Sequence, residues 1–188
     1  MKNTSTNPVS FPIDALTDLA RHMEWADAMV WRAVLAHDGA VTDQRLRNLL
    51  VHLHMVQRFF LVVWRGDPIA PLQAFSTFDQ LVDLQQRAVS YYPDLRGFLE
   101  SLDEAALTRP ITMPFVAEEE KRLGMKFEPP TLAETIVQVT SHSTYHRGQV
   151  NARLREVGGV PPLVDYIAWL YFRRPAADWS SPAMGAAG

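Results

Sequence analysis

The sequence predicts an all-α fold built from four long helices. Over four stretches, apolar residues recur at intervals of three and four, which places them on one face of a helix. Helix-capping residues open the last of these stretches, and glycine or proline closes most of them. Residues 109–130 are the least helical part of the predicted domain. We therefore expect a short irregular or hairpin insertion before the last long helix, and a short C-terminal helix after it.

Length and composition fit one globular domain. The chain has 188 residues, 47% of them hydrophobic and 21% charged, which is enough for an apolar core without disulfides. We assign residues 11–174 to a single domain and expect 1–10 and 175–188 to be flexible ends, because their composition favours disorder.

Charge and hydropathy limit the partners and the location. A net charge of −3 and a pI near 6.0 predict no nucleic-acid or membrane partner. The N-terminus lacks the apolar core of a signal peptide, and no stretch reaches the roughly 18 apolar residues of a membrane span. We therefore expect a cytoplasmic protein.

The first helix is predicted from Ile13 to about His37. Asp27 falls inside its apolar stripe. A carboxylate on an apolar face is costly unless it is paired or hydrogen-bonded, so Asp27 needs a partner from another helix. The alternative is a bend in the helix that lets Asp27 reach solvent. The stripe consists of Leu16, Leu19, Ala20, Met23, Ala26, Val30 and Val34.

The second helix is predicted from about Asp43 to Arg65. On the phase that its apolar residues suggest, His52 points into the core and His54 points roughly the opposite way. His52 is then either a core histidine bonded to a carbonyl or a ligand that faces partners on other helices. The predicted inward face consists of Leu49, His52, Leu53, Val56, Phe59, Phe60 and Val63.

The third helix is predicted to start at Ser76 or Thr77, with a kink near Tyr92 caused by Pro93. In the following segment, residues 111–116 and 125–128 could form a short hairpin or two extended arms. The residues predicted to face inward on the third helix are Phe78, Leu81, Val82, Gln85, Val89, Tyr92, Phe98, Leu99 and Leu102.

The fourth helix, predicted from Thr131 to Val157, carries the most informative motif. His142 and His146 are four residues apart, so their imidazoles lie one above the other and can converge on one point. Gln149 and Arg153 follow along the same edge of the apolar stripe. A short apolar segment, 163–172, comes next and is predicted to form the C-terminal helix.

Together with His52, this pair predicts a three-histidine metal site. The chain has no cysteine, so a metal would have to be held by His, Asp or Glu. Three neutral nitrogens suit Zn, Ni, Cu or Fe(II), and they leave coordination positions open for water or substrate. We expect Zn or Ni, with Fe and Mn as further candidates. The alternative is a histidine pair that binds nothing.

Several motifs resemble the DinB/YfiT-like family of metal-binding helical bundles. They are Trp-Ala-Asp at 25–27, His52 followed by Gly66, and HSTYHRGQVNARLREVGGVPPLVDYIAWL at 142–170. The resemblance implies an up-down-down-up four-helix bundle, a divalent metal held by His52, His142 and His146, and a homodimer. It also implies a thiol-dependent transferase or isomerase that uses a low-molecular-weight thiol such as bacillithiol or mycothiol. Asp27 stands where the family commonly has Asn.

The function expected is therefore that of a metal-dependent thiol S-transferase or isomerase acting on a small electrophilic molecule. Arg147 and Asp27 are the candidate catalytic residues, and Arg153 and Gln149 the candidates for binding the thiol or substrate, since arginine binds carboxylates through two points. A structural ion pair of Arg147 with Asp165 is the alternative for that arginine.

Two other classes of function fit the same histidines. A metal-dependent hydrolase would use metal-bound water and would need Asp27 or Asp165 as a base. A non-catalytic bundle would bind metal or ligand in a stress response. A cleft at the site would favour an enzyme, and a requirement for added thiol would separate a transferase from a hydrolase.

Overall fold

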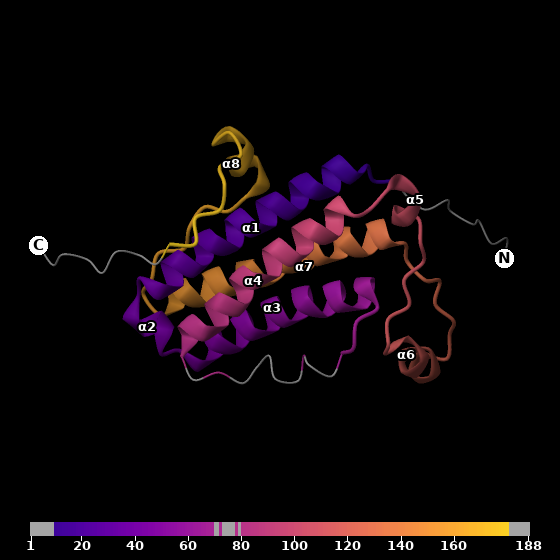
Figure 1. The fold of residues 1–188 in the computed structure, drawn as a ribbon. Helices are drawn as coiled ribbons and strands as arrows, with labels where there is room; N and C mark the ends of the chain where they lie inside the picture. The colour runs from indigo at the N-terminus through magenta and orange to yellow at the C-terminus, as the bar shows by residue number, and fades with distance from the viewer. Residues whose placement is uncertain (1–9, 70–71, 73–77, 79, 181–188) are drawn as a thin grey trace, which may run out of the picture.

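The computed structural model describes residues 10–69, 72, 78 and 80–180, which form helices and no β-strand (Figure 1). The predicted all-α class is confirmed for this part of the chain. None of its helices is both long enough and apolar enough to cross a membrane. The long helices are α1 (Ile13–Leu35), α3 (Gln44–Arg65), α4 (Leu81–Glu100) and α7 (Leu132–Glu156). The short helices are α2 (Asp38–Val41), α5 (Glu104–Leu107), α6 (Val116–Leu123) and α8 (Tyr166–Tyr171).

The four long helices lie side by side (Figure 1). In that view α1 and α7 run in one direction and α3 and α4 in the other. Helix α7 packs against both α1 and α3, and α4 covers the same two helices. Side chains of α7 therefore contact both α1 and α3.

Side chains fix the ends of the helices that carry the histidines. Asp43 caps α3 by accepting a hydrogen bond from the backbone N–H of Leu46, and Gly66 ends that helix with a φ of 72°. Thr131 and Glu134 form the predicted capping box at the start of α7. Because caps of this kind contribute roughly 1 kcal/mol each, they set where both helices begin.

The insertion before α7 consists of two extended arms that carry α6. Backbone hydrogen bonds of 2.8 Å join the arms at their base, from Ile111 N to the Pro130 carbonyl and from Leu132 N to the Arg109 carbonyl. Of the two predicted forms, a short hairpin or two extended arms, the arms are observed, and an isolated β-bridge between Pro110 and Thr131 joins them. We did not predict α6, which forms because its Glu, Lys and Arg residues favour helix and Gly124, with a φ of 66°, ends it.

The predicted start of the third helix at Ser76 or Thr77 lies outside the described residues. Helix α4 is described from Leu81, where Gln80 and Asp83 form a capping box, and it continues through Pro93 as expected. Val82, predicted to face inward, is 41% exposed, so that assignment is wrong. Leu81 is buried as predicted, and Leu84, which was not predicted to face inward, is buried as well.

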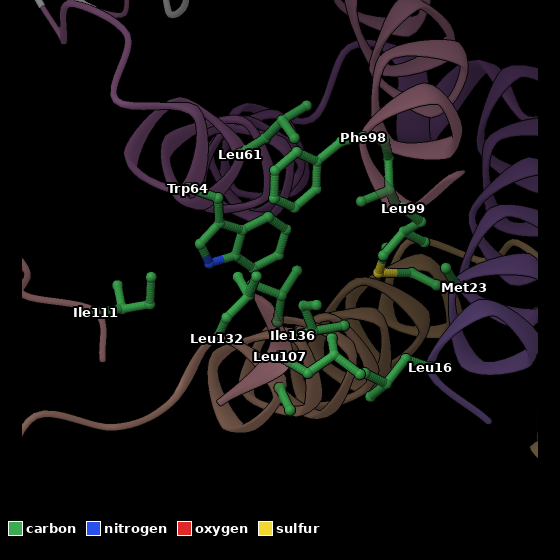
Figure 2. Close-up of a cluster of buried hydrophobic side chains, with 14 of the residues drawn as sticks. Leu16, Met23, Leu61, Trp64, Phe98, Leu99, Leu107, Ile111, Leu132 and Ile136 are labelled. Carbon is green, nitrogen blue, oxygen red and sulfur yellow. The ribbon is translucent and has the colours of Figure 1, made fainter. Parts of the chain in front are cut away.

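A large apolar cluster holds one end of the four long helices together (Figure 2). The indole of Trp64 lies at its centre, stacked on Phe98 with ring centroids 5.7 Å apart, and its N–H donates to the Thr135 hydroxyl over 2.9 Å. A second cluster around Trp31 fills the other end. The helices are therefore fixed on both sides of the polar residues in the middle.

The predicted phase of α3 is wrong by part of a turn. His54 is buried, with 2% of its surface exposed, whereas His52 is only half-buried on the flank of the helix. Apolar residues surround this helix, so their spacing does not single out one face. Two polar residues settle the phase, because His54 and Gln57 find hydrogen-bond partners only inside the protein. The residues buried on α3 are Leu46, Leu50, Leu53, His54, Gln57, Leu61 and Trp64.

A buried polar network joins the four long helices around Asp27, whose burial is confirmed. Its carboxylate accepts hydrogen bonds from Arg147 Nη1 and Gln57 Nε2, both at 2.8 Å, and from the Tyr92 hydroxyl. His54 extends the network, since its Nδ1–H donates to Gln57 Oε1 over 2.8 Å. The expected partner of Asp27 on another helix is therefore Arg147.

Part of the C-terminal stretch that was predicted to be flexible makes specific contacts. The Trp179 ring lies 5.6 Å from that of Tyr92 and packs against both apolar clusters. Asp178 accepts a hydrogen bond of 2.7 Å from Arg32 Nη1 on α1. Residues 175–180 are thus held against α1, and 181–188 lie outside the described residues.

We predict that Asp27→Asn lowers the free energy of unfolding by about 3–5 kcal/mol, because it leaves the guanidinium of Arg147 buried without a counter-charge. Urea denaturation at neutral pH measures this loss. Asp18→Asn is the control, since Asp18 pairs with Arg21 and Arg174 at the surface and its loss should cost less than about 1 kcal/mol. Equal effects of the two substitutions would contradict the assigned role of Asp27.

The same ion pair sets how stability depends on pH. Burial by itself raises the pKa of Asp27, but the charge of Arg147 and the hydrogen bonds from Gln57 and Tyr92 outweigh it and hold the pKa below its ordinary value of 3.8. The stabilisation by the ionised carboxylate is then complete above pH 3.8 and is lost as the pH falls through the folded-state pKa. The stability difference between wild type and Asp27→Asn should therefore stay constant from pH 7 to about 4 and narrow below it.

Candidate metal centre

Helices α3 and α7 bring three imidazoles together. His52 comes from α3, and His142 and His146 come from successive turns of α7. The ring centroids of His142 and His146 are 4.2 Å apart, and the ring of His52 lies 4.4 Å from that of His146. One nitrogen of each ring lies within 4.8 Å of the others, so the three residues could hold a metal ion.

One nitrogen of this cluster has an unmet hydrogen bond. His142 Nε2 is closed off from solvent and has no partner among the described residues. Leaving a buried polar nitrogen unpaired costs about 1–3 kcal/mol, whereas a ligand bond to a cation would satisfy it. The donor set of three imidazoles therefore fits a divalent ion of the zinc type.

Gln149 orients the ring of His146. The His146 Nδ1–H donates to Gln149 Oε1 over 2.8 Å, because the amide oxygen can only accept. This bond fixes the tautomer and leaves Nε2 with its lone pair free. Partners of this kind hold a ligand ring in place and raise its basicity.

The local electrostatics keep two of the rings neutral. Partial burial, and after it the imidazole of His146, lower the pKa of His52 below its ordinary value of 6.5. Partial burial also lowers the pKa of His142, and the rings of His146 and His52 add to the effect. Neutral rings are what a metal needs, since a protonated imidazole cannot coordinate.

Binding of an ion would draw the rings closer. Tetrahedral bonds of about 2.1 Å place the ligand nitrogens about 3.4 Å apart, so each ring would move by roughly 1 Å or less. The side chains of His52 and His142 are half-buried. An ion held there would keep coordination positions that the protein does not fill.

The structure places Arg147 and Asp27 in the core, where they bind each other. Their side chains are 2% and 0% exposed, and Arg147 Nη2 also donates to the Thr144 hydroxyl over 2.9 Å. The alternative pair of Arg147 with Asp165 is wrong, because Asp27 takes the place of Asp165. Neither side chain is exposed for direct contact with a substrate, so a catalytic role for either stays a prediction.

Arg153 is engaged in surface ion pairs. It donates from Nε and Nη2 to the carboxylate of Asp43, at 3.0 and 2.5 Å, and from Nη1 to Glu156 at 2.8 Å. The hydrogen bond from Arg153 lowers the pKa of Asp43 to about 2. Arg153 thus ties the end of α7 to the start of α3, and its predicted role in binding a thiol or substrate would require it to leave Asp43.

Sequence reasoning missed the polar residues behind the histidines. Gln57 Nε2 donates over 3.1 Å to the hydroxyl of Ser143, the residue next to His142. A signal for this was present in the sequence, since Gln57 follows His54 by three residues, as Gln149 follows His146. Both His–Gln pairs form the same 2.8 Å hydrogen bond within one helix.

Comparison with known proteins identifies one family. The sequence model of one family, described as the DinB family, matches residues 16–176, which include all three histidines. No curated protein and no solved structure matches the chain.

We predict that Gln149→Leu weakens the binding of Zn²⁺ by about 10- to 100-fold, because the ring of His146 loses its orienting acceptor. A competition titration with a chromogenic zinc chelator measures the change. Gln138→Leu is the matched control, since Gln138 lies exposed on the same helix. An unchanged affinity in Gln149→Leu would show that this hydrogen bond does not support metal binding.

The pKa directions predict how binding depends on pH. Protons compete with the metal only below the pKa of each ring, and the pKa values of His52 and His142 lie below 6.5. Protons on His52 and His142 should therefore weaken zinc binding only below pH 6.5, and NMR titration of these two rings in the metal-free protein measures where they gain their protons. Protonation of either ring above pH 6.5 would contradict the lowered pKa values.

Proposed function

The chain belongs to the DinB family, and from this membership and its three-histidine cluster we propose that it is a divalent-metal-dependent enzyme. Its reaction is the transfer of a low-molecular-weight thiol to a small electrophilic molecule, or the isomerisation of that molecule with the thiol as a helper. Zn or Ni is the preferred metal, and Fe or Mn is the next choice.

The observation that supports this proposal is the composition of the three-histidine cluster. Within the described residues it contains three histidines and no carboxylate, and its His142 Nε2 lacks a hydrogen-bond partner. Three neutral ligands leave the full positive charge of an ion for whatever occupies the open positions. A bound divalent ion lowers the pKa of a thiol or water beside it, so that the nucleophile is available near neutral pH.

The residues of the chain supply the geometry for this chemistry. His52, His142 and His146 hold the three nitrogens, and Gln149 fixes one ring. In a transfer, the sulfur of the thiol forms a bond to a carbon of the electrophile, the leaving group departs with its electron pair, and the thiol proton passes to solvent. In an isomerisation, the same S–C bond forms and later breaks.

The hydrolase alternative lacks an available base. Asp27 is fully buried, and its carboxylate already accepts hydrogen bonds from Arg147, Gln57 and Tyr92. Asp165 lines a separate cavity that includes none of the three histidines. A thiol needs less help than water, since it loses its proton more readily. This difference favours the thiol-dependent reaction over hydrolysis.

Two further expectations stay predictions. The first is the homodimer implied by the resemblance, which light scattering of the purified protein measures. The second is catalysis itself, since a bundle that binds metal for sensing would keep the same three ligands. Turnover is the observation that separates the enzyme from the sensor.

We predict that the purified protein binds one Zn²⁺ or Ni²⁺ per chain, and that His142→Ala combined with His146→Ala abolishes the binding. The variant should keep its helical circular dichroism, because apolar clusters at both ends hold the fold without the site. Elemental analysis gives the metal content. His37→Ala is the control, since His37 donates to the Val157 carbonyl, away from the cluster, and its loss should leave one ion bound.

The reaction is tested with the metal-loaded protein, a panel of thiols and 1-chloro-2,4-dinitrobenzene as electrophile. We expect turnover that requires both the thiol and the metal and that is lost in the double histidine variant. Turnover without thiol would support the hydrolase instead. One bound ion with no turnover in either assay would support the non-catalytic alternative.

A further inference from the structure

An apolar surface follows His52 along α3 towards the C-terminal end of that helix. Residues four and seven positions apart share one face of a helix, so Val56 and Phe59 lie on the same side of α3 as His52. Phe59 lies about 10 Å further along the helix axis than His52. All three side chains are half-buried, so each keeps part of its surface in contact with solvent.

The insertion before α7 adds a second aromatic ring to this surface. Phe115, the residue before α6, stacks on Phe59 with ring centroids 6.4 Å apart and an angle of 24° between the ring planes. Phe115 is 50% exposed, and Figure 1 shows α6 beside the C-terminal end of α3. We call the surface formed by Val56, Phe59 and Phe115 the aromatic strip. It begins one turn from a metal-ligand candidate and joins segments that are far apart in the sequence.

The charged side chains in this part of α3 point away from the aromatic strip. Arg58 and Arg65 both turn to α4, where Arg58 Nη1 donates to the carboxylate of Asp94 and Arg65 Nη2 donates to its backbone carbonyl. The other residues of α3 between His52 and Arg65 carry no charge apart from the titratable ring of His54, which is buried. On the side of α3, the strip therefore offers apolar and aromatic surface without a charge.

Charged groups lie in the other direction from the metal centre. Asp43 and Arg45 precede His52 on α3, whereas the aromatic strip follows it. Arg153 donates to Asp43 and to Glu156, and Arg45 lies 3.5 Å from Glu156. The metal centre thus lies between a charged end of the helix pair and an apolar surface. A molecule bound to the ion would find different chemistry on its two sides.

The aromatic strip is preformed, which lowers the cost of binding to it. The rings of Phe59 and Phe115 already stack on each other, and Phe59 also packs against the apolar cluster around Trp64. A flat apolar group that covers their accessible surface removes this surface from water, and it need not first order the side chains. Aromatic groups gain most, because stacked or edge-to-face contacts add to the effect of burial.

We propose that the aromatic strip binds the body of the electrophile and makes the metal centre selective for electrophiles with a flat apolar body. This inference rests on the proposed function, since the electrophile reacts at the ion held by the histidines. Phe59 and Phe115 determine specificity in this proposal, and neither takes part in bond formation or proton transfer.

Two hydroxamates test the aromatic strip without turnover. Acetohydroxamate and 4-phenylbenzohydroxamate bind a metal through the same two oxygens, but only the second carries a flat apolar body long enough to reach Phe59. Each is titrated into the full chain loaded with Co²⁺ and followed by the visible absorption of the ion. We expect 4-phenylbenzohydroxamate to bind at least about tenfold more tightly than acetohydroxamate, because its rings cover the accessible surface of the strip.

Two variants assign this preference to the strip. Phe115→Ala should reduce it about three- to fivefold and leave acetohydroxamate binding unchanged, because an exposed ring is removed without touching the histidines. Phe59→Leu should also reduce it, and leucine keeps an apolar side chain against the cluster on which Phe59 packs. Tyr171→Ala is the control, since Tyr171 is 78% exposed on α8, which Figure 1 shows across the bundle from α3. The control should leave the binding of both hydroxamates unchanged.

Equal binding of the two hydroxamates to the wild type would overturn the proposal, and so would an unchanged preference in both Phe115→Ala and Phe59→Leu. These outcomes are distinct from failure of the proposed reaction, because the titration contains no thiol. A tenfold preference that the two variants reduce, in a protein without thiol-dependent turnover, would support the aromatic strip and contradict the transfer. Co²⁺ bound at the histidines with no spectral response to either hydroxamate would contradict both proposals.

Discussion

The buried ion pair between Asp27 and Arg147 is the interaction on which the arrangement of the helices depends. Arg147 follows the metal-ligand candidate His146 directly, so the contact that ties α7 to α1 also fixes the turn that carries the imidazole. Gln57 joins α3 to the same carboxylate and to Ser143, and Tyr92 joins α4. The histidines thus lie at the edge of a polar layer in which each helix constrains the others.

Burying this layer costs free energy, which explains why the polar atoms of Asp27 and Gln57 are all hydrogen-bonded. A buried carboxylate or guanidinium without partners would destabilise the fold by several kcal/mol. Each group on Asp27 and Gln57 therefore meets a partner, and the apolar clusters on either side exclude water. A layer of this kind permits few other registers between the helices, which is a useful property where nitrogens from two helices must meet at one point.

The features that were predicted correctly from the sequence depend on interactions between residues that are close together in the chain. The spacing of His142 and His146, the capping box at Thr131 and the glycine that ends α3 each depend on residues a few positions apart. Asp27 was predicted to be buried and paired for a similar reason, since the cost of a charge on an apolar face does not depend on the fold. Which residue pairs with Asp27 depends on the fold. From the sequence, Asp165 was considered as the ion-pair partner of Arg147, whereas the structure pairs Arg147 with Asp27.

The phase of α3 could not be predicted in the same way. Its apolar residues surround the helix, and the difference between His52 and His54 arises from contacts with other helices. His54 is buried because Trp31 Nε1 donates to its Nε2 over 2.8 Å while Gln57 accepts from Nδ1. His146 has the matching glutamine, but among the described residues no tryptophan donates to its Nε2, whose lone pair could bind a metal.

A crystal structure of the zinc-loaded protein, with anomalous diffraction recorded at the zinc absorption edge, tests the central claim most directly. The account predicts one anomalous peak between α3 and α7, bonded at about 2.0–2.1 Å to one nitrogen each of His52, His142 and His146, with a fourth ligand that is not a protein side chain. An ion bound elsewhere, or one that leaves His52 uncoordinated, would contradict it.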